Sequence, residues 1–335
     1  MVIGIEMYRA VRRVQETGKG TLIISLPKQW ARRWGVGKGS LVEVRDRGDG
    51  RLVIDPAYGE REPSRRALIR YPVRRPEHLA WGIIGAYLLG YDVITVYGGR
   101  IGGEDRARIE EAIRKLIGLE VMEETATKVE IHCIIDPSLL DPKRILQRMC
   151  GIVVGMLRDI YRSISERDRG LAGMVRRRDD DLDRLYFLTV RVLRAAAGRP
   201  GLAEELGLTP IECLDFRVAA NLLETNGDIA SNMAREVEEL ETPISGDMVE
   251  ALRPLFEEAA EMQLKALGGF LSSDVGALSE VRSKLSRLVE GLEKVRDRAG
   301  ELPALISIAS YMEEFGRNCV DLADLIAPVG IIEGL

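Results

Sequence analysis

Residues 221–232 have the sequence Asn-Leu-Leu-Glu-Thr-Asn-Gly-Asp-Ile-Ala-Ser-Asn, and residues 310–321 have the sequence Ser-Tyr-Met-Glu-Glu-Phe-Gly-Arg-Asn-Cys-Val-Asp. Each stretch places a glutamate three residues before a glycine, and polar residues interrupt an otherwise apolar helical pattern. The two stretches start 89 residues apart. Such a repeat predicts two copies of one structural unit in the C-terminal half of the chain.

The surrounding sequence is helical throughout. From Asp141 onward apolar residues recur at steps of three and four, and breaks fall near Pro200, Pro243 and Pro303. The pattern predicts six helices, near 142–167, 176–197, 209–239, 247–271, 275–298 and 302–327. They group into two three-helix bundles, over residues 141–240 and 245–328.

The repeated Glu-x-x-Gly pattern, with aspartate after the first glycine, resembles the PhoU family of phosphate-uptake regulators, which stack two three-helix bundles. The resemblance covers residues 142–327 and implies acidic pairs that hold iron or zinc clusters. Carried onto this sequence, it predicts a site for iron, zinc or another divalent metal in the first bundle, made by Asp179, Asp183, Glu224 and Asp228. Acids four apart share a helix face and repel each other unless a cation lies between them, and carboxylate oxygens suit such cations.

The second bundle departs from this pattern. Its third helix keeps Glu313 but has Arg317 where the second acid belongs, and its second helix has Arg282 and Ser286 at the corresponding positions. We therefore predict one metal site, and an ion pair of Arg317 with Glu313 or Glu314. The alternative for the first bundle is that the acids of residues 179–183 form a solvated helix start. Glu224 and Asp228 are harder to explain in that way, because they interrupt an apolar helix.

The first 56 residues predict a small β module. Alternating residues indicate strands at 11–15, 21–25, 41–45 and 51–54, and glycines at 18, 20, 48 and 50 suit the hairpin turns between them. Pro27 and Gly35 bracket a short helix. A module this small buries too little surface alone, so dimerisation is predicted.

The stretch from Gln15 to Lys28, with Gly35-Val36 and Gly39 after it, resembles the AbrB/SpoVT family of swapped-hairpin DNA-binding domains. The resemblance implies that two chains interlock into one barrel and that basic residues on it contact DNA: Arg12, Arg13, Lys19, Lys28, Arg32 and Arg33. The alternatives are an ordinary solvated face, or a barrel that serves only to pair two chains.

A polar, proline-bounded segment at residues 56–66 suits a linker. Beyond it, strands and helices alternate over residues 67–140, which predicts a small α/β layer. The glycine-rich turn 98–103 lies between a strand and a helix, where backbone amides can hold an anion. It lacks the ending of a phosphate-binding P-loop, and Glu104 adds a negative charge, so an ordinary loop is the simpler interpretation. The predicted fold is thus α+β and mostly helical.

Charge and motifs limit the function. Residues 1–55 carry a net charge of +5 and residues 201–335 carry −15, an asymmetry typical of a nucleic-acid-binding module joined to an acidic body. The four cysteines are widely spaced and His78 and His132 are isolated, while serine-hydrolase, zinc-protease and Walker motifs are absent. The longest apolar stretch is too short to span a bilayer, so we expect a cytoplasmic protein. Because these catalytic motifs are absent, we also expect that it is not an enzyme.

The sequence therefore favours a homodimeric, phosphate-responsive transcriptional regulator that controls phosphate uptake or metabolism. One alternative is a signalling adaptor that docks on a phosphate transporter or sensor kinase without binding DNA. A third hypothesis, a metal-dependent phosphohydrolase, is less favoured because the sequence lacks a base or nucleophile motif.

Overall fold

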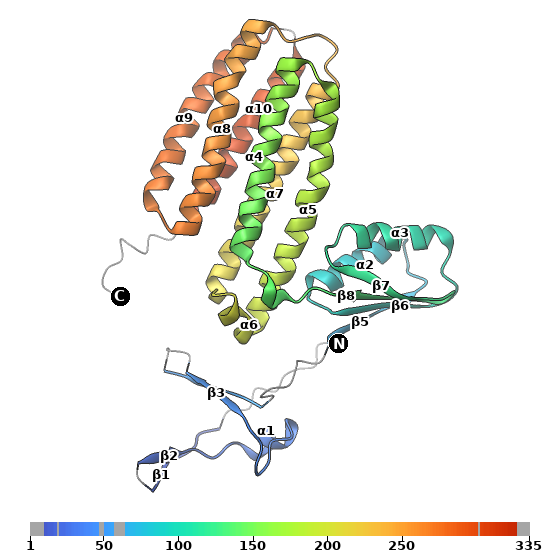
Figure 1. Ribbon diagram of the computed structural model, residues 1–335, viewed down its shortest axis with the longest axis vertical. Helices are drawn as coiled ribbons and strands as arrows, with labels where there is room; N and C mark the ends of the chain where they lie inside the picture. Colours follow the sequence, from blue (N-terminus) through green and yellow to red (C-terminus); the bar gives the residue numbers. More distant parts are fainter. Residues whose placement is uncertain (1–9, 19, 47–49, 57–63, 301, 327–335) are drawn as a thin grey trace. The chain divides into compact units, whose positions relative to one another are not determined.

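The computed structural model describes residues 10–18, 20–46, 50–56, 64–300 and 302–326 (Figure 1). The chain divides into two compact units, Met1–Ser64 and Arg65–Leu335. The predicted linker falls at this division, and most of it lies outside the described residues. Among the residues described, no helix is long and apolar enough to cross a membrane.

The N-terminal unit consists of two hairpins and a short helix. β1 (Gln15–Thr17) pairs with β2 (Thr21–Ile23), and β3 (Glu43–Asp46) pairs with β4 (Leu52–Asp55), both antiparallel. The helix α1 (Lys28–Arg33) lies between them in the sequence, with Pro27 before it. The two hairpins form separate two-stranded sheets, so the interlocked two-chain barrel stays a prediction.

The strand bounds differ from those predicted. Residues 11–14 were predicted to form most of the first strand, but the strand begins at Gln15, and the third strand begins at Glu43 rather than Leu41. Within one chain, β2 offers only three residues for pairing, from Thr21 to Ile23. A strand without a partner leaves its backbone groups unpaired, so the alternating pattern alone does not extend it.

The second unit begins with the predicted α/β layer. Its strands are β5 (Arg66–Tyr71), β6 (Val93–Gly98), β7 (Leu119–Glu124) and β8 (Lys128–Cys133), in the order β5-β6-β8-β7. β5 and β6 are parallel, and the other neighbours are antiparallel. Helices α2 (Glu77–Leu88) and α3 (Gly103–Arg114) lie on the same side of this sheet (Figure 1).

One glycine fixes the end of the parallel pair. Gly98 has φ 145°, and a Cβ added there would collide with the carbonyl oxygen of Tyr71 on the neighbouring strand. Only glycine permits this approach. The predicted glycine-rich turn therefore has a structural role at its first residue, where β6 ends against β5.

The first helical bundle follows a 3₁₀ turn at Pro137–Leu139. It contains α4 (Pro142–Glu166), α5 (Arg169–Gly198) and α7 (Pro210–Glu238), with the short α6 (Pro200–Glu205) between the last two. The side chain of Asp168 caps α5 by accepting from the backbone N–H of Leu171. The prediction that this helix starts at 176 is therefore wrong by seven residues, and α6 was missed.

The second bundle contains α8 (Gly246–Ser272), α9 (Val275–Arg298) and α10 (Pro303–Asp324), close to the predicted bounds. α4 and α7 pack against α8 and α10, so one hydrophobic core runs through both bundles. Buried polar groups lie at this junction, where the amide nitrogen of Asn226 donates to Gln263 Oε1 at 2.6 Å. The two repeats therefore share an interior.

A buried arginine fastens the α/β layer to the first bundle. Arg191 of α5 is 3% exposed and donates to the carbonyl oxygens of Tyr87 and Tyr91 at 2.7 and 2.9 Å. It also lies 3.4 Å from Asp92 Oδ1, and its guanidinium sits over the Tyr87 ring. These oxygens and the ring provide partners for the buried guanidinium. A charge is retained inside a protein only when it has such partners.

Candidate functional site

Three of the four predicted acids meet on facing helices of the first bundle. Ligand oxygens of Asp179 and Asp183 on α5 and of Asp228 on α7 all lie within 4.8 Å of one another. The spacing of four residues puts the first two on one face of α5. Glu224 lies one helical turn before Asp228 on α7 and interacts electrostatically with the other three acids. Three of the residues predicted from the sequence thus form one carboxylate cluster, with Glu224 beside them.

The cluster carries concentrated negative charge in a half-buried place. Burial, together with the charges of Asp228 and Asp183, raises the pKa of Asp179 to about 6. Burial and the same neighbours raise the pKa of Glu224 to about 7. The pKa values of Asp183 and Asp228 are also raised, chiefly by burial. A bound cation would reverse each of these effects, because an opposite charge favours the ionised carboxylate.

Close packing holds the two helices together at the cluster. A Cβ added to Gly227 would collide with the side chain of Leu182, and it would lie 3.4 Å from Asp179 Oδ1. Glycine at this position therefore lets α7 approach the face of α5 that carries the acids. Among the described side chains, Asp179 Oδ1 is a buried oxygen without a hydrogen-bond partner. A buried acceptor left unpaired is costly, so a ligand that contacts this oxygen would stabilise the cluster.

Cations of the protein stand near the cluster. The charge of Arg217 acts on Glu224 and that of Lys115, at the end of α3, acts on Asp183, both lowering the pKa. Arg217 donates to the hydroxyl of Tyr186 at 2.7 Å and its guanidinium lies over that ring. These neighbours were not predicted from the sequence, since nothing in their spacing connects them to the acids.

The first residue of α5, Arg169, tests the alternative that the acids form a solvated helix start. Asp179 lies ten residues inside α5, so the interpretation of residues 179–183 as a solvated helix start is wrong. The acids gain nothing from the helix N-terminus at this distance, because that effect is confined to the first turn. Their mutual repulsion is therefore not offset by the helix dipole.

The corresponding place in the second bundle holds ion pairs. Glu313 Oε2 accepts from Arg296 at 2.7 Å, and Glu313 Oε1 accepts from Arg317 at 2.6 Å. These hydrogen bonds hold the pKa of Glu313 below its usual value. Arg282 pairs with Asp324 at 2.9 Å, and the Ser286 hydroxyl donates to the Arg282 carbonyl oxygen at 3.4 Å. The predicted pairing of Arg317 with Glu313 is thus present.

The basic residues of the N-terminal module are all at the surface where they are described. Arg12 and Arg13 precede β1, whereas Lys28, Arg32 and Arg33 belong to α1. Lys19 lies outside the described residues. Within the described part of the chain, none of the five forms an ion pair. Their charges are thus not neutralised by an acid within the described residues.

The same module exposes its apolar strands. Leu22 is 69% exposed and Val44 is 56% exposed, although both lie inside strands. No described residue between 10 and 56 is fully buried. Large apolar side chains that strands leave exposed indicate a candidate protein–protein contact.

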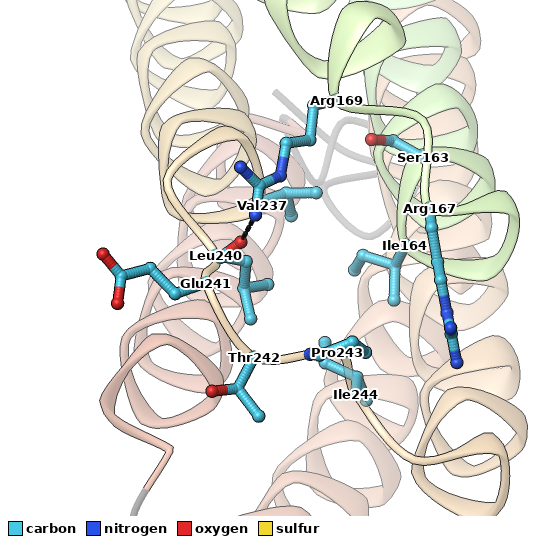
Figure 2. Close-up of a pocket in the computed structure, with 10 residues that line it drawn as sticks. All are labelled: Ser163, Ile164, Arg167, Arg169, Val237, Leu240, Glu241, Thr242, Pro243 and Ile244. Atoms are coloured by element: carbon cyan, nitrogen blue, oxygen red, sulfur yellow. Dashed lines mark hydrogen bonds between the residues drawn. The ribbon is translucent and has the colours of Figure 1, made fainter.

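A separate pocket lies between the turn from α4 to α5 and the loop from α7 to α8 (Figure 2). Its volume is about 90 Å³, and apolar side chains such as Ile164, Val237 and Ile244 line it. Arg169 spans the pocket wall and donates to the Leu240 carbonyl oxygen (Figure 2). This volume is below the ~300 Å³ at which ligand pockets usually begin, and no predicted site residue lines it.

Comparison with known proteins gives two family matches. Residues 146–237 match the model of the PhoU domain. Over these residues the chain is similar to the PhoU domain. Residues 15–63 match the model described as "Antidote-toxin recognition MazE, bacterial antitoxin". The solved structure of PhoU from Pseudomonas aeruginosa matches with 22% identity over 59% of this chain and 98% of that one, at a TM-score of 0.49. No curated protein matches the chain.

The PhoU match contains the whole carboxylate cluster, from Asp179 to Asp228, and ends before the second bundle. The ion-paired Glu313 therefore lies outside it. The antitoxin match contains Lys19, Lys28, Arg32 and Arg33, whereas Arg12 and Arg13 precede it. Both sets of predicted site residues thus fall mainly within matched segments.

Proposed function

We propose that this chain is a phosphate-responsive transcriptional regulator that binds DNA as a dimer and controls phosphate uptake or metabolism. The observation that carries the proposal is the joining of two segments in one chain. An antitoxin-type module with unpaired basic residues precedes a PhoU domain with a carboxylate cluster. The first supplies a contact for phosphates of DNA, and the second supports a role in phosphate homeostasis.

The exposed strands of the N-terminal module support the dimer. Leu22 and Val44 stay exposed in the described part of the N-terminal unit, so burying them and their neighbours requires a further surface. Hydrophobic burial favours closure by about 25 cal/mol for each Å² removed from water. A second copy of the same module offers the same apolar strands, and a two-fold arrangement makes such a surface self-complementary.

The carboxylate cluster supports a metal centre in the PhoU domain. Asp179, Asp183 and Asp228 would hold a divalent cation, with Glu224 beside them. Iron, zinc or manganese fits this donor set, since oxygen ligands from carboxylates bind such cations. When bound, the metal supplies positive charge that keeps the four acids ionised. The protein residues supply the position: Gly227 sets the approach of the helices, and Arg217 and Lys115 balance the remaining charge.

The helical half would receive the phosphate signal from a transporter or sensor protein, a role that the PhoU match supports. A signalling adaptor that never binds DNA would use the same half, so the N-terminal module distinguishes the two functions.

The deciding experiment measures binding of the full chain to its own upstream DNA over a salt series, beside a random duplex of equal length. The test variant carries Arg12→Glu and Arg13→Glu. The control variant carries Arg148→Glu and Arg177→Glu, two exposed arginines of α4 and α5 for which no ion pair is found in the described part of the chain.

We expect salt-sensitive binding with a preference for the upstream DNA, lost in the test variant and kept in the control. Absence of binding by the wild-type chain would overturn the regulator and favour the adaptor that docks on a transporter or sensor kinase.

A further inference from the structure

The edge of the α/β layer carries arginines that no acid of the described chain neutralises. Arg66 and Arg70 lie on β5, Arg74 and Arg75 follow it, and Arg100 follows β6. We name these five residues the arginine edge. All are exposed, and none forms an ion pair within the described residues. By contrast, Arg106 and Arg108 of the same layer are paired with acids.

The strand register places part of the arginine edge on the open face of the sheet. On β5, Ala67, Ile69 and Tyr71 pack into the core below α2 and α3. Successive side chains of a strand point to opposite faces, so Arg66, Leu68 and Arg70 lie on the other face. The helices leave that face uncovered (Figure 1). Accordingly, Leu68 is 68% exposed.

An aromatic residue stands beside these arginines. Tyr97 of β6 is the register partner of Arg70 in the parallel pair, and it is 41% exposed. Its ring and hydroxyl combine an apolar body with a polar tip. Arginine guanidinium groups and tyrosine hydroxyls both donate hydrogen bonds to the phosphate oxygens of DNA.

The other acids of this face lie on β7 and β8. Glu123 and Glu130 share the cation Lys128, and Glu120, the register partner of His132, forms no ion pair within the described residues. Glu130 of β8 pairs with Lys128 at 2.8 Å and with His132 at 2.8 Å, and Glu123 pairs with Lys128 at 2.6 Å. Near the ends of β5 and β6, Asp105 accepts from Tyr71 and Arg108. Glu77 and Glu104 also lie near these strand ends and reduce the local positive charge without cancelling five arginines. The net charge at the arginine edge is therefore positive.

We propose that the arginine edge is a second DNA-contacting surface that binds the phosphate backbone. This inference rests on the proposed function, because it requires that the chain binds DNA. Ten residues separate Asp55 at the end of β4 from Arg66 at the start of β5. At most about 3.6 Å per residue, this length of chain spans ~36 Å, roughly one turn of B-DNA. The segment between β4 and β5 is thus long enough for one duplex to contact both the N-terminal module and the arginine edge.

Phosphate contacts of this kind position a protein on DNA and carry no sequence information. The arginine edge would therefore strengthen binding to any duplex that continues beyond the site of the N-terminal module. It would raise affinity and salt sensitivity equally for the upstream DNA and for random DNA. Loss of sequence preference is expected from changes in the N-terminal module, not in the edge.

The test measures binding of the full chain to long duplexes that extend about two helical turns on each side of the bound site, across a salt series. The test variant replaces Arg70, Arg74 and Arg75 with alanine. A charge-matched control replaces Arg148, Arg177 and Arg194 with alanine, which are exposed on α4 and α5. A second variant, with Arg70→Lys, Arg74→Lys and Arg75→Lys, keeps the charge and removes the guanidinium groups.

We expect the alanine variant to reduce the slope of log affinity against log salt by about 2 to 3, since each phosphate contact contributes roughly 0.9. Its affinity at ~0.15 M salt should fall about tenfold or more, by the same factor for both DNAs. The lysine variant should keep the wild-type slope, and the control should match the wild type. These results together would support the inference.

Wild-type binding by the alanine variant would overturn the inference while leaving the proposed function intact, and the edge would then suit an acidic protein partner. An equal loss in the control variant would also overturn it, because the effect would be one of net charge. If the wild-type chain itself binds no DNA, both this inference and the proposed function fail.

Discussion

Arg317 Nη2 lies 2.6 Å from Glu313 Oε1 within α10, at the two positions that α7 fills with Asp228 and Glu224. The repeat therefore keeps the glutamate in both bundles and replaces the aspartate with a cation only in the second. In the first bundle the acids face the aspartates of α5, and in the second bundle Glu313 is neutralised by Arg296 and Arg317. In the second bundle, arginines of the protein thus supply the positive charge that the proposed cation would supply in the first.

This difference predicts one metal site per chain. After incubation with manganese, iron or zinc and removal of free metal, we expect the purified chain to retain one divalent ion, measured by elemental analysis. Asp179→Asn and Asp228→Asn should abolish retention, because they remove two of the three clustered ligands. Glu313→Gln is the matched control and should keep it. Two retained ions, or equal retention in Asp228→Asn, would contradict the site.

The raised pKa of Glu224 predicts a pH-dependent cost in the metal-free chain. Its folded pKa is about 7, whereas an unperturbed glutamate titrates near ~4.3. The folded state thus binds more protons between these values, and stability falls as the pH rises from ~4 to ~7. Glu224→Gln should raise the melting temperature of metal-free protein at neutral pH and leave it nearly unchanged at about pH 4.

Glu313→Gln provides a control of opposite sign. Arg317 and Arg296 lower the folded pKa of Glu313, so its contribution is present above the unfolded pKa and is lost as the pH falls through the folded value. Removing it should destabilise the chain at neutral pH by about 1 kcal/mol or less, because Arg317 is largely exposed. Shifts of the same sign in both variants would contradict the assigned causes.

The approach of α5 and α7 predicts a strict requirement for glycine at 227. In Gly227→Ala the new methyl group collides with Leu182, which is fully buried. We expect a loss of about 1–3 kcal/mol in the free energy of unfolding, the usual range for overpacking, together with weaker metal retention. Gly151→Ala in α4 is the control, since nothing lies within 4 Å of its added Cβ. It should stabilise the helix by up to ~1 kcal/mol. Equal effects of the two substitutions in urea unfolding would argue against close approach.

The sequence predicted elements wherever periodicity and capping residues agreed. The helix predicted at 275–298 has those bounds in the structure, because Asp274 caps a regular apolar repeat. The prediction began α5 too late because Gly170 and Gly173 weaken the apolar pattern in its first turns, although Asp168 is a clear cap. α6 has six residues, too few for a helical period to appear.

The acids of the candidate site were also predicted from local sequence patterns. Asp179 and Asp183 on one helix and Asp228 on another were found from local spacing and an internal repeat, both of which are visible in one sequence. Arg191 was missed, although it interrupts an apolar run, because its partners Tyr87 and Asp92 lie about a hundred residues away. Contacts over such separations follow from the fold, which sequence periodicity does not specify.

Arg191 also gives a prediction for the joint between the α/β layer and the first bundle. Arg191→Met keeps much of the apolar side chain but leaves the carbonyl oxygens of Tyr87 and Tyr91 without this donor. We expect a loss of about 3 kcal/mol in the first urea transition, in the range for buried hydrogen bonds to a charged group. Limited proteolysis should also cleave residues 65–135 earlier in Arg191→Met than in the wild-type chain. Arg194→Met, one turn along and exposed, is the control and should change stability by less than ~0.5 kcal/mol. Indistinguishable unfolding of the two variants would mean that apolar packing, not the buried guanidinium, joins the layer to the bundle.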